Sequence, residues 1–243
     1  MLDDAALVFL IFLAATLYSS VGHAGASGYL AAMALFGVAP ETMKPAALVL
    51  NILVAAIATT RFLTAKAFSA QLFIPLVLTS APFAFLGGAW TLSGQWYKIL
   101  VAFALVTAAF RLALHSRGAE KPLVEAPLWQ TLILGAAIGL LSGLTGVGGG
   151  IYLTPVILFA GWARPREASG VSAAFILVNS ITGLAGRWQA APSLPPQIPY
   201  WAAAALCGGL LGSHLGVKRL SAMGLRRALS AVLVVAAIKL IYS

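Results

Sequence analysis

The chain has 243 residues, of which 61% are hydrophobic and only 9% are charged. A soluble domain carries about 25% charged residues, so this composition excludes a soluble protein of any size. The net charge of +9 comes from basic residues scattered between apolar runs, which is typical of the orientation signal of a membrane protein rather than of a nucleic-acid-binding patch. The single cysteine, Cys207, excludes an internal disulfide and any cysteine-based cluster.

Ten apolar segments follow one another along the chain, and most have the roughly 17–25 residues that a helix needs to cross a bilayer. The second and seventh segments are shorter and rich in glycine, so we expect short tilted helices or re-entrant half-helices there. The runs are long and do not alternate, which excludes a membrane β-barrel. In chain order, the predicted segments are 5–21, 24–37, 45–62, 72–90, 99–114, 128–147, 148–161, 168–185, 200–217 and 225–242.

Two stretches of the sequence repeat one pattern of small residues. Residues 142–150 read S-G-L-T-G-V-G-G-G, and residues 18–25 read Y-S-S-V-G-H-A-G. Asn51 in the third segment also matches Asn179 in the eighth. Paired, glycine-broken hydrophobic segments in two matching halves are the best sequence pointer to a transporter's binding site.

This duplication divides the chain into an N-terminal transmembrane repeat at 1–114, a cytoplasmic linker at 115–127 and a C-terminal transmembrane repeat at 128–243. With five segments per half and the N-terminus outside, eleven of the fifteen Lys and Arg residues fall in cytoplasmic loops, as the positive-inside bias requires. Four crossings per half would place six of those eleven outside. An odd number of segments per half makes the two halves inverted relative to each other.

The expected fold is therefore an all-α polytopic membrane protein. It consists of two inverted repeats of about five hydrophobic segments each, with short glycine-broken segments at 24–37 and 148–161. Both termini are expected outside the cell inner (plasma) membrane.

The polar residues inside the apolar segments favour an anionic substrate. None of the six acidic residues lies in the middle of a long segment, whereas a cation pump or proton relay normally keeps a carboxylate there. Hydroxyl, amide and imidazole groups, together with freed amides at a half-helix N-terminus, can donate hydrogen bonds to an anion. The predicted substrate-binding residues are Ser20, Gly22, His23, Gly25, Ser27, Asn51, Thr145, Gly146, Gly148, Gly149, Gly150, Ser172 and Asn179.

Each of these predictions has a structural alternative. The glycines could let helices pack closely, and Asn51 and Asn179 could bridge helices. His23, whose match in the second copy is Val147, is either a ligand or proton carrier or a hydrogen-bonded structural residue. The chain has no metalloprotease, phosphate-loop or nucleophile-elbow motif, so we expect no enzyme activity, catalytic residue, metal site or cofactor.

The second copy of the motif, followed by Pro155 and by R-E-A-S-G-V-S at 166–172, resembles the TauE/SafE family of sulfite exporter-type permeases, also called the toluenesulfonate uptake permease superfamily. The resemblance covers nearly the whole chain, and the first copy departs from the family pattern at His23 and Ala24. It implies a prokaryotic-type inner-membrane carrier of small sulfur anions such as sulfite, sulfoacetate or sulfonates.

The sequence thus predicts a secondary transporter that works by alternating access around a site at the membrane midplane. An inside-negative potential favours anion exit by about 2.3 kcal/mol per charge per 100 mV, so export is the expected direction. An anion channel, or a permease for another small organic anion, is the alternative. The expected partners are the small anionic substrate, a coupling proton or sodium ion and the lipid bilayer; a homodimer is left open, and no nucleic acid is expected.

Overall fold

The computed structural model describes residues 2–20, 22–92, 94–113, 123–188, 194–216 and 223–242, and this part of the chain is all-helical. The predicted segments coincide with its helices to within a few residues, which confirms the ten-segment organisation. Most of the predicted linker at 115–127 lies outside the described residues, and the boundaries of the two repeats stay predictions. The helices are α1 (Leu2–Ser19), α2 (Ala26–Leu35), α3 (Pro40–Thr64), α4 (Ala70–Ala89), α5 (Gly94–Ala113), α6 (Leu128–Thr145), α7 (Gly150–Ala160), α8 (Pro165–Trp188), α9 (Ile198–Gly216) and α10 (Met223–Tyr242).

The helices differ in how much of a membrane they can cross. Within the described residues, α3, α4, α6 and α8 are long and apolar enough to span a bilayer on their own. With 10 and 11 residues, α2 and α7 are only about 15–17 Å long, roughly half the ~30 Å thickness of the hydrocarbon core. The prediction of two short helices is therefore confirmed.

The short helix α2 runs back along α1. The Ser27 hydroxyl of α2 donates a hydrogen bond of 2.6 Å to the Tyr18 hydroxyl near the end of α1. Gly28 lies against Ala14, one turn earlier on α1. Because later residues of α2 contact earlier residues of α1, the two helices are antiparallel and the chain reverses at the first glycine motif.

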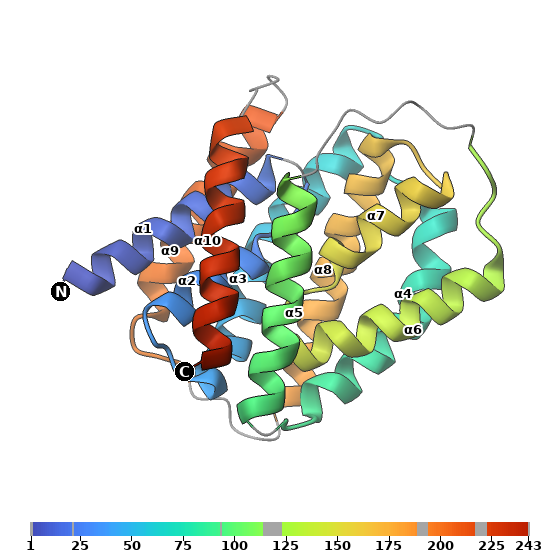
Figure 1. The fold of residues 1–243 in the computed structure, drawn as a ribbon. Helices are drawn as coiled ribbons and strands as arrows, with labels where there is room; N and C mark the ends of the chain where they lie inside the picture. The colour runs from blue at the N-terminus through green and yellow to red at the C-terminus, as the bar shows by residue number, and fades with distance from the viewer. Residues whose placement is uncertain are drawn as a thin grey trace.

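The two halves of the sequence are interleaved in space. Figure 1 shows α4 and α6 side by side at one end of the molecule and α1 beside α9 at the other. Between them α3 packs on α8 and α9, and α5 packs along α10. Helices of the predicted N-terminal repeat therefore form their closest pairs with helices of the predicted C-terminal repeat.

Glycine notches make these pairs close. On α6, Gly135, Gly139 and Gly143 face the main chain of α4, and a Cβ added at any of them would lie within 2.1–2.3 Å of an α4 carbonyl oxygen. Gly208 and Gly212 of α9 face the main chain of α1 in the same way. Small residues at one-turn intervals are the usual means by which membrane helices approach closely. Close packing of the helices is therefore enough to explain why these positions are glycine.

The apolar core has two parts. One cluster of buried side chains lies mainly among α1, α2, α3, α5, α9 and α10, and the other among α4, α6, α7 and α8. Tyr152 of α7 packs against both clusters. The second glycine motif therefore lies at the boundary between the two groups of helices.

Candidate functional site

The duplicated motif places left-handed glycines at matching positions of the two breaks. Gly22 and Gly146 both have φ of +81°, and Gly25 and Gly149 have φ of +103° and +82°. In each pair the second glycine lies 124 residues after the first. Residues other than glycine rarely adopt this left-handed conformation, so it explains the glycines that the sequence repeats.

At the first break, the turn at Gly22 fixes the position of His23. The Gly22 amide donates to the Ser19 carbonyl at 3.2 Å, and the His23 amide donates to the Tyr18 carbonyl at 2.9 Å. These two bonds, with a left-handed glycine between them, form the Schellman motif that ends many helices. His23 is thereby the first residue that leaves α1 completely.

The two glycine breaks leave helix N-termini in the protein interior. Gly25 is the N-cap residue of α2 and Gly149 that of α7, and a glycine has no side chain with which to cap the helix that it precedes. An uncapped N-terminus presents main-chain N–H groups and carries about half a positive elementary charge. Such ends are suited to an anion.

The two copies of the motif meet at His23. Its Nε2 atom lies 3.3 Å from the Gly150 carbonyl oxygen and 3.0 Å from the Thr154 hydroxyl oxygen. The Thr154 hydroxyl is also 3.0 Å from the Gly150 carbonyl and 2.6 Å from the Ser172 hydroxyl on α8. All four residues are buried. The predicted residues His23, Gly150 and Ser172 are therefore brought together, and Thr154 joins them without having been predicted.

A second polar group surrounds Gly148. A Cβ added there would lie 2.8 Å from Asn51 Nδ2 and 3.3 Å from the Ser180 hydroxyl oxygen. Asn51, Asn179 and Ser180 are completely buried, and their side-chain oxygen and nitrogen atoms have no hydrogen-bond partner among the described residues. Buried polar groups are normally paired, so these amides and this hydroxyl have unused capacity to bind something.

Three predicted hydroxyls are instead engaged in the turns themselves. Ser20 donates to the Leu17 carbonyl at 2.7 Å, and Ser27 donates to the Tyr18 hydroxyl. Thr145 donates to a carbonyl within α6 and accepts a bond of 3.3 Å from the Val147 amide. Their role in substrate binding stays a prediction.

The remaining glycines of the motif pack against neighbouring side chains. Gly25 lies against the ring of Tyr29, whose hydroxyl donates to the Ala24 carbonyl. Gly149 lies between Ile138 and Phe175, in the second apolar cluster. At both positions a side chain would meet atoms within 3 Å, so close packing explains the absence of a Cβ.

The two breaks lie toward opposite ends of α3. Gly22 contacts Phe62, near the last residue of α3, and Ser169, near the start of α8. Gly146 contacts Lys44, near the first residue of α3. Asn51, beside Gly148, lies between these ends. The polar residues of the motifs therefore follow α3 from its last turns, past its middle, to its first turns.

Lys44 is a residue of this region that the sequence analysis missed. It is only 5% exposed, and its ammonium group donates to the carbonyls of Gly87 and Gly88 at 3.0 Å and to that of Trp90 at 3.4 Å. The apolar run predicted a helix from residue 45, which placed Lys44 in an outside loop. The helix begins five residues earlier, because Pro40 is well suited to its first position, and the extra turn carries Lys44 into the interior.

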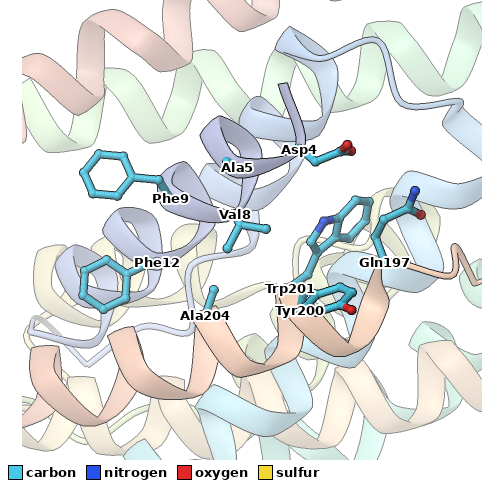
Figure 2. A pocket seen from close by; sticks show the side chains of 9 residues that line it. All are labelled: Asp4, Ala5, Val8, Phe9, Phe12, Gln197, Tyr200, Trp201 and Ala204. Carbon is cyan, nitrogen blue, oxygen red and sulfur yellow. The ribbon is translucent and has the colours of Figure 1, made fainter. Parts of the chain in front are cut away.

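Two hollows of the molecule lie away from the glycine motifs. One of about 580 Å³ lies between the first turns of α1 and α9, and Figure 2 shows Phe9 and Phe12 at one side of it and Asp4 and Gln197 at the other. A smaller one of about 260 Å³ adjoins it near Phe36. None of the predicted site residues lines either hollow. The glycine motifs are closely packed, because a Cβ added at Gly22, Gly25, Gly148 or Gly149 would lie 2.6–2.9 Å from a neighbouring atom.

Comparison with known proteins agrees with the architecture. Residues 7–240 match the family described as Sulfite exporter TauE/SafE. The chain is 39% identical over 241 residues to a protein of Sinorhizobium fredii (strain NBRC 101917 / NGR234) described as "Probable membrane transporter protein y4hK", and the match covers 97% of each chain. No solved structure matches the 243-residue chain. The family resemblance predicted from the motif is confirmed, and the chain belongs to the TauE/SafE family of integral membrane transporters.

Proposed function

We propose that the protein carries small sulfur-containing anions, such as sulfite, sulfoacetate or other sulfonates, and that the anion binds where the two glycine breaks converge. The observation that carries this proposal is the pair of unpartnered polar side chains beside Gly148, Asn51 and Ser180, together with the unpartnered amide of Asn179, the residue before Ser180 on α8. Leaving such atoms unpaired costs about 1–3 kcal/mol each, so a site that keeps them together has a use for them.

The charge of the interior supports an anion rather than a cation. Among the residues whose exposure the structure describes, Lys44 is buried, whereas no aspartate or glutamate is. The other buried polar groups are hydroxyls, amides and an imidazole, all of which can donate hydrogen bonds. A cation carrier normally keeps a carboxylate inside the membrane.

The arrangement of the two breaks supports alternating access. Two glycine breaks that contact α3 near its opposite ends, each followed by a half-helix, are what inverted repeats produce. Because the helix pairs are interleaved, we infer that the moving units are the group containing α1 and α9 and the group containing α4 and α6. The predicted halves 1–114 and 128–243 would then not move as separate bodies. The close packing around Gly148 favours such a carrier over an anion channel.

The charge of the loops supports the placement of the protein in the inner membrane with both termini outside. In that orientation the Lys44 end of α3 faces outward and the end near Phe62 faces the cytoplasm. An inside-negative potential then drives a bound anion from the Phe62 end to the Lys44 end, which is export.

Purified protein in liposomes tests this function. Uptake of sulfite, sulfoacetate, sulfate, thiosulfate and simple carboxylates would be measured with and without the same anion on the opposite side. We expect saturable uptake of a sulfur anion that is accelerated by counterflow. Large unitary currents would show that the protein is a channel and not a carrier. Transport restricted to carboxylates would show that the proposed substrate class is wrong.

A further inference from the structure

A second electropositive group lies beside the end of α6, apart from the amides and Asn residues at the middle of α3. Lys44 lies against Gly146, the glycine that ends α6. The Arg187 guanidinium at the end of α8 is close enough to interact electrostatically with the Lys44 ammonium and with the buried Tyr97 hydroxyl. The exposed Glu41 carboxylate, in the first turn of α3, also acts on that hydroxyl. The Tyr97 hydroxyl in turn donates to the Thr145 carbonyl at 3.4 Å, one residue before Gly146.

The burial of Lys44 needs an explanation. All three of its hydrogen bonds go to main-chain carbonyls at the end of α4, and none goes to a carboxylate. These carbonyls satisfy its three donors, and the helix C-terminus contributes partial negative charge, but none of the three acceptors carries a full negative charge. A charged side chain inside a membrane protein is costly and by default marks a functional site.

A purely structural role does not account for the type of residue. A neutral amide could cap the same carbonyls, because glutamine also carries N–H donors. Placing a second cation, Arg187, near the first raises the electrostatic cost further, unless negative charge arrives between them.

We propose that Lys44 and Arg187 form a cationic subsite that holds the transported anion at the Gly146 end of its path. The inference rests on the proposed transport of anions, and it extends that function by assigning the charge that balances the substrate. The Trp90 carbonyl is the most distant of the three acceptors, at 3.4 Å, and it is the one that Lys44 exchanges for an oxygen of the anion.

Charge-neutral and charge-keeping variants test the subsite. Lys44→Gln keeps hydrogen-bond donors but loses the charge, and Lys44→Arg keeps the charge. Lys239→Gln is the matched control, because Lys239 also donates to a helix-terminal carbonyl, that of Leu35 at 2.6 Å, but is exposed and far along the chain from the motif. Two measurements would be made with sulfite and with sulfoacetate: the rise in melting temperature in detergent, and KM for uptake into liposomes.

We expect Lys44→Gln to weaken binding and raise KM by about tenfold or more, as loss of a close charged contact does, with the melting temperature of the anion-free protein unchanged. Lys44→Arg should stay within about threefold of the wild type, Arg187→Gln should show an intermediate loss, and Lys239→Gln should show none.

The outcomes separate this inference from the proposed function. Wild-type KM in Lys44→Gln would overturn the subsite while leaving the transporter in place. The subsite would also be overturned if Lys44→Gln lowered the melting temperature but bound the anion normally, because Lys44 would then only cap a helix. Binding that depends on Lys44 without any uptake by the wild type would support the subsite and contradict carrier function. Neither binding nor uptake of either anion would overturn both.

Discussion

The two glycine breaks share left-handed glycines at matched positions and differ in the residues around them. Gly22 and Gly146 have the same φ, and each ends a long helix against the start of another, but the first meets Ser169 whereas the second meets Lys44. At the next position the first break has His23 and the second has Val147. The two breaks therefore match at two glycines, while the side chains beside them differ at the two ends of α3.

This difference separates general from specific recognition. Main-chain amides at the two half-helix N-termini can attract any anion, because their charge comes from the helix dipole. In the proposed function, specific recognition comes from two side-chain groups: the imidazole network of His23, which joins the two breaks, and the Lys44 ammonium group beside Gly146. Variants that make the two breaks alike, or that remove what they share, test this view.

The largest effect is expected at Gly148, which lies against Asn51 in the second break. Gly148→Ala places a Cβ 2.8 Å from Asn51 Nδ2 at a φ of +82°. Because a displacement of about 1 Å in a site can cost on the order of 100-fold, anion uptake into liposomes should fall by about that factor. Gly37→Ala is the control, since Gly37 also has a positive φ of +69° but has no atom within 4 Å of the added Cβ. Equal uptake by the two alanine variants would place the site elsewhere.

The next effect is expected at the two asparagines. Asn51→Leu and Asn179→Leu replace unpartnered amides by apolar groups of similar size, so stability should stay within about 1 kcal/mol of the wild type or rise. Uptake should nevertheless fall by about tenfold or more in each, because a hydrogen bond to a charged ligand is worth about 1.5–3 kcal/mol. Ser80→Ala, which removes another buried unpartnered hydroxyl on α4, is the control and should transport normally. Loss of folding without loss of specific activity would make both amides structural.

A smaller effect is expected at His23, where the breaks differ most. His23→Val gives the first break the side chain of the second, and His23→Gln keeps hydrogen bonding but cannot change charge. Since an imidazole changes charge between about pH 5 and 8, wild-type transport should vary with pH there and both variants should be flat. Rates of initial uptake at a series of pH values check this. If the glutamine variant keeps the wild-type profile, His23 is a packing residue and coupling must reside elsewhere.

The smallest effect is expected at Ser20. Its hydroxyl is already bonded to the Leu17 carbonyl of the same helix, so Ser20→Ala should change KM by less than about twofold. Thr154→Val is the informative contrast, because it keeps the shape of a side chain that contacts both His23 and Ser172. A loss of affinity in Ser20→Ala that equals the loss in Thr154→Val would show that the serine leaves its helix to bind the substrate.

Much of this architecture could be predicted from the sequence, because the signals were local. Apolar runs located all ten helices, and glycines 124 residues apart located the two turns. The contact of His23 with Gly150 and the position of the buried Asn51 beside Gly148 could not be predicted, because they depend on tertiary packing. Lys44 was missed because a charged residue beside an apolar run is normally assigned to a loop. The helix in fact begins at Pro40, so Lys44 lies within its first turns. Thr154 was missed because a threonine in a short apolar helix has no distinguishing pattern.

The interleaving of the two halves could not be predicted either. Gly208 and Gly212 on α9 are ordinary small residues in the sequence, and only the structure shows that they fit the main chain of α1. Which helix a glycine notch faces depends on the path of the whole chain. The predicted inversion of the halves relative to the membrane stays a prediction.

Calorimetric titration of sulfite and sulfoacetate into the wild type and into the double variant Asn51→Leu, Asn179→Leu tests the central claim most directly. The wild type should bind at least one of these anions at one site per chain, and the double variant should lose that binding while its melting temperature is unchanged or higher. Equal affinity in the two proteins would contradict a binding site at the convergence of the glycine breaks.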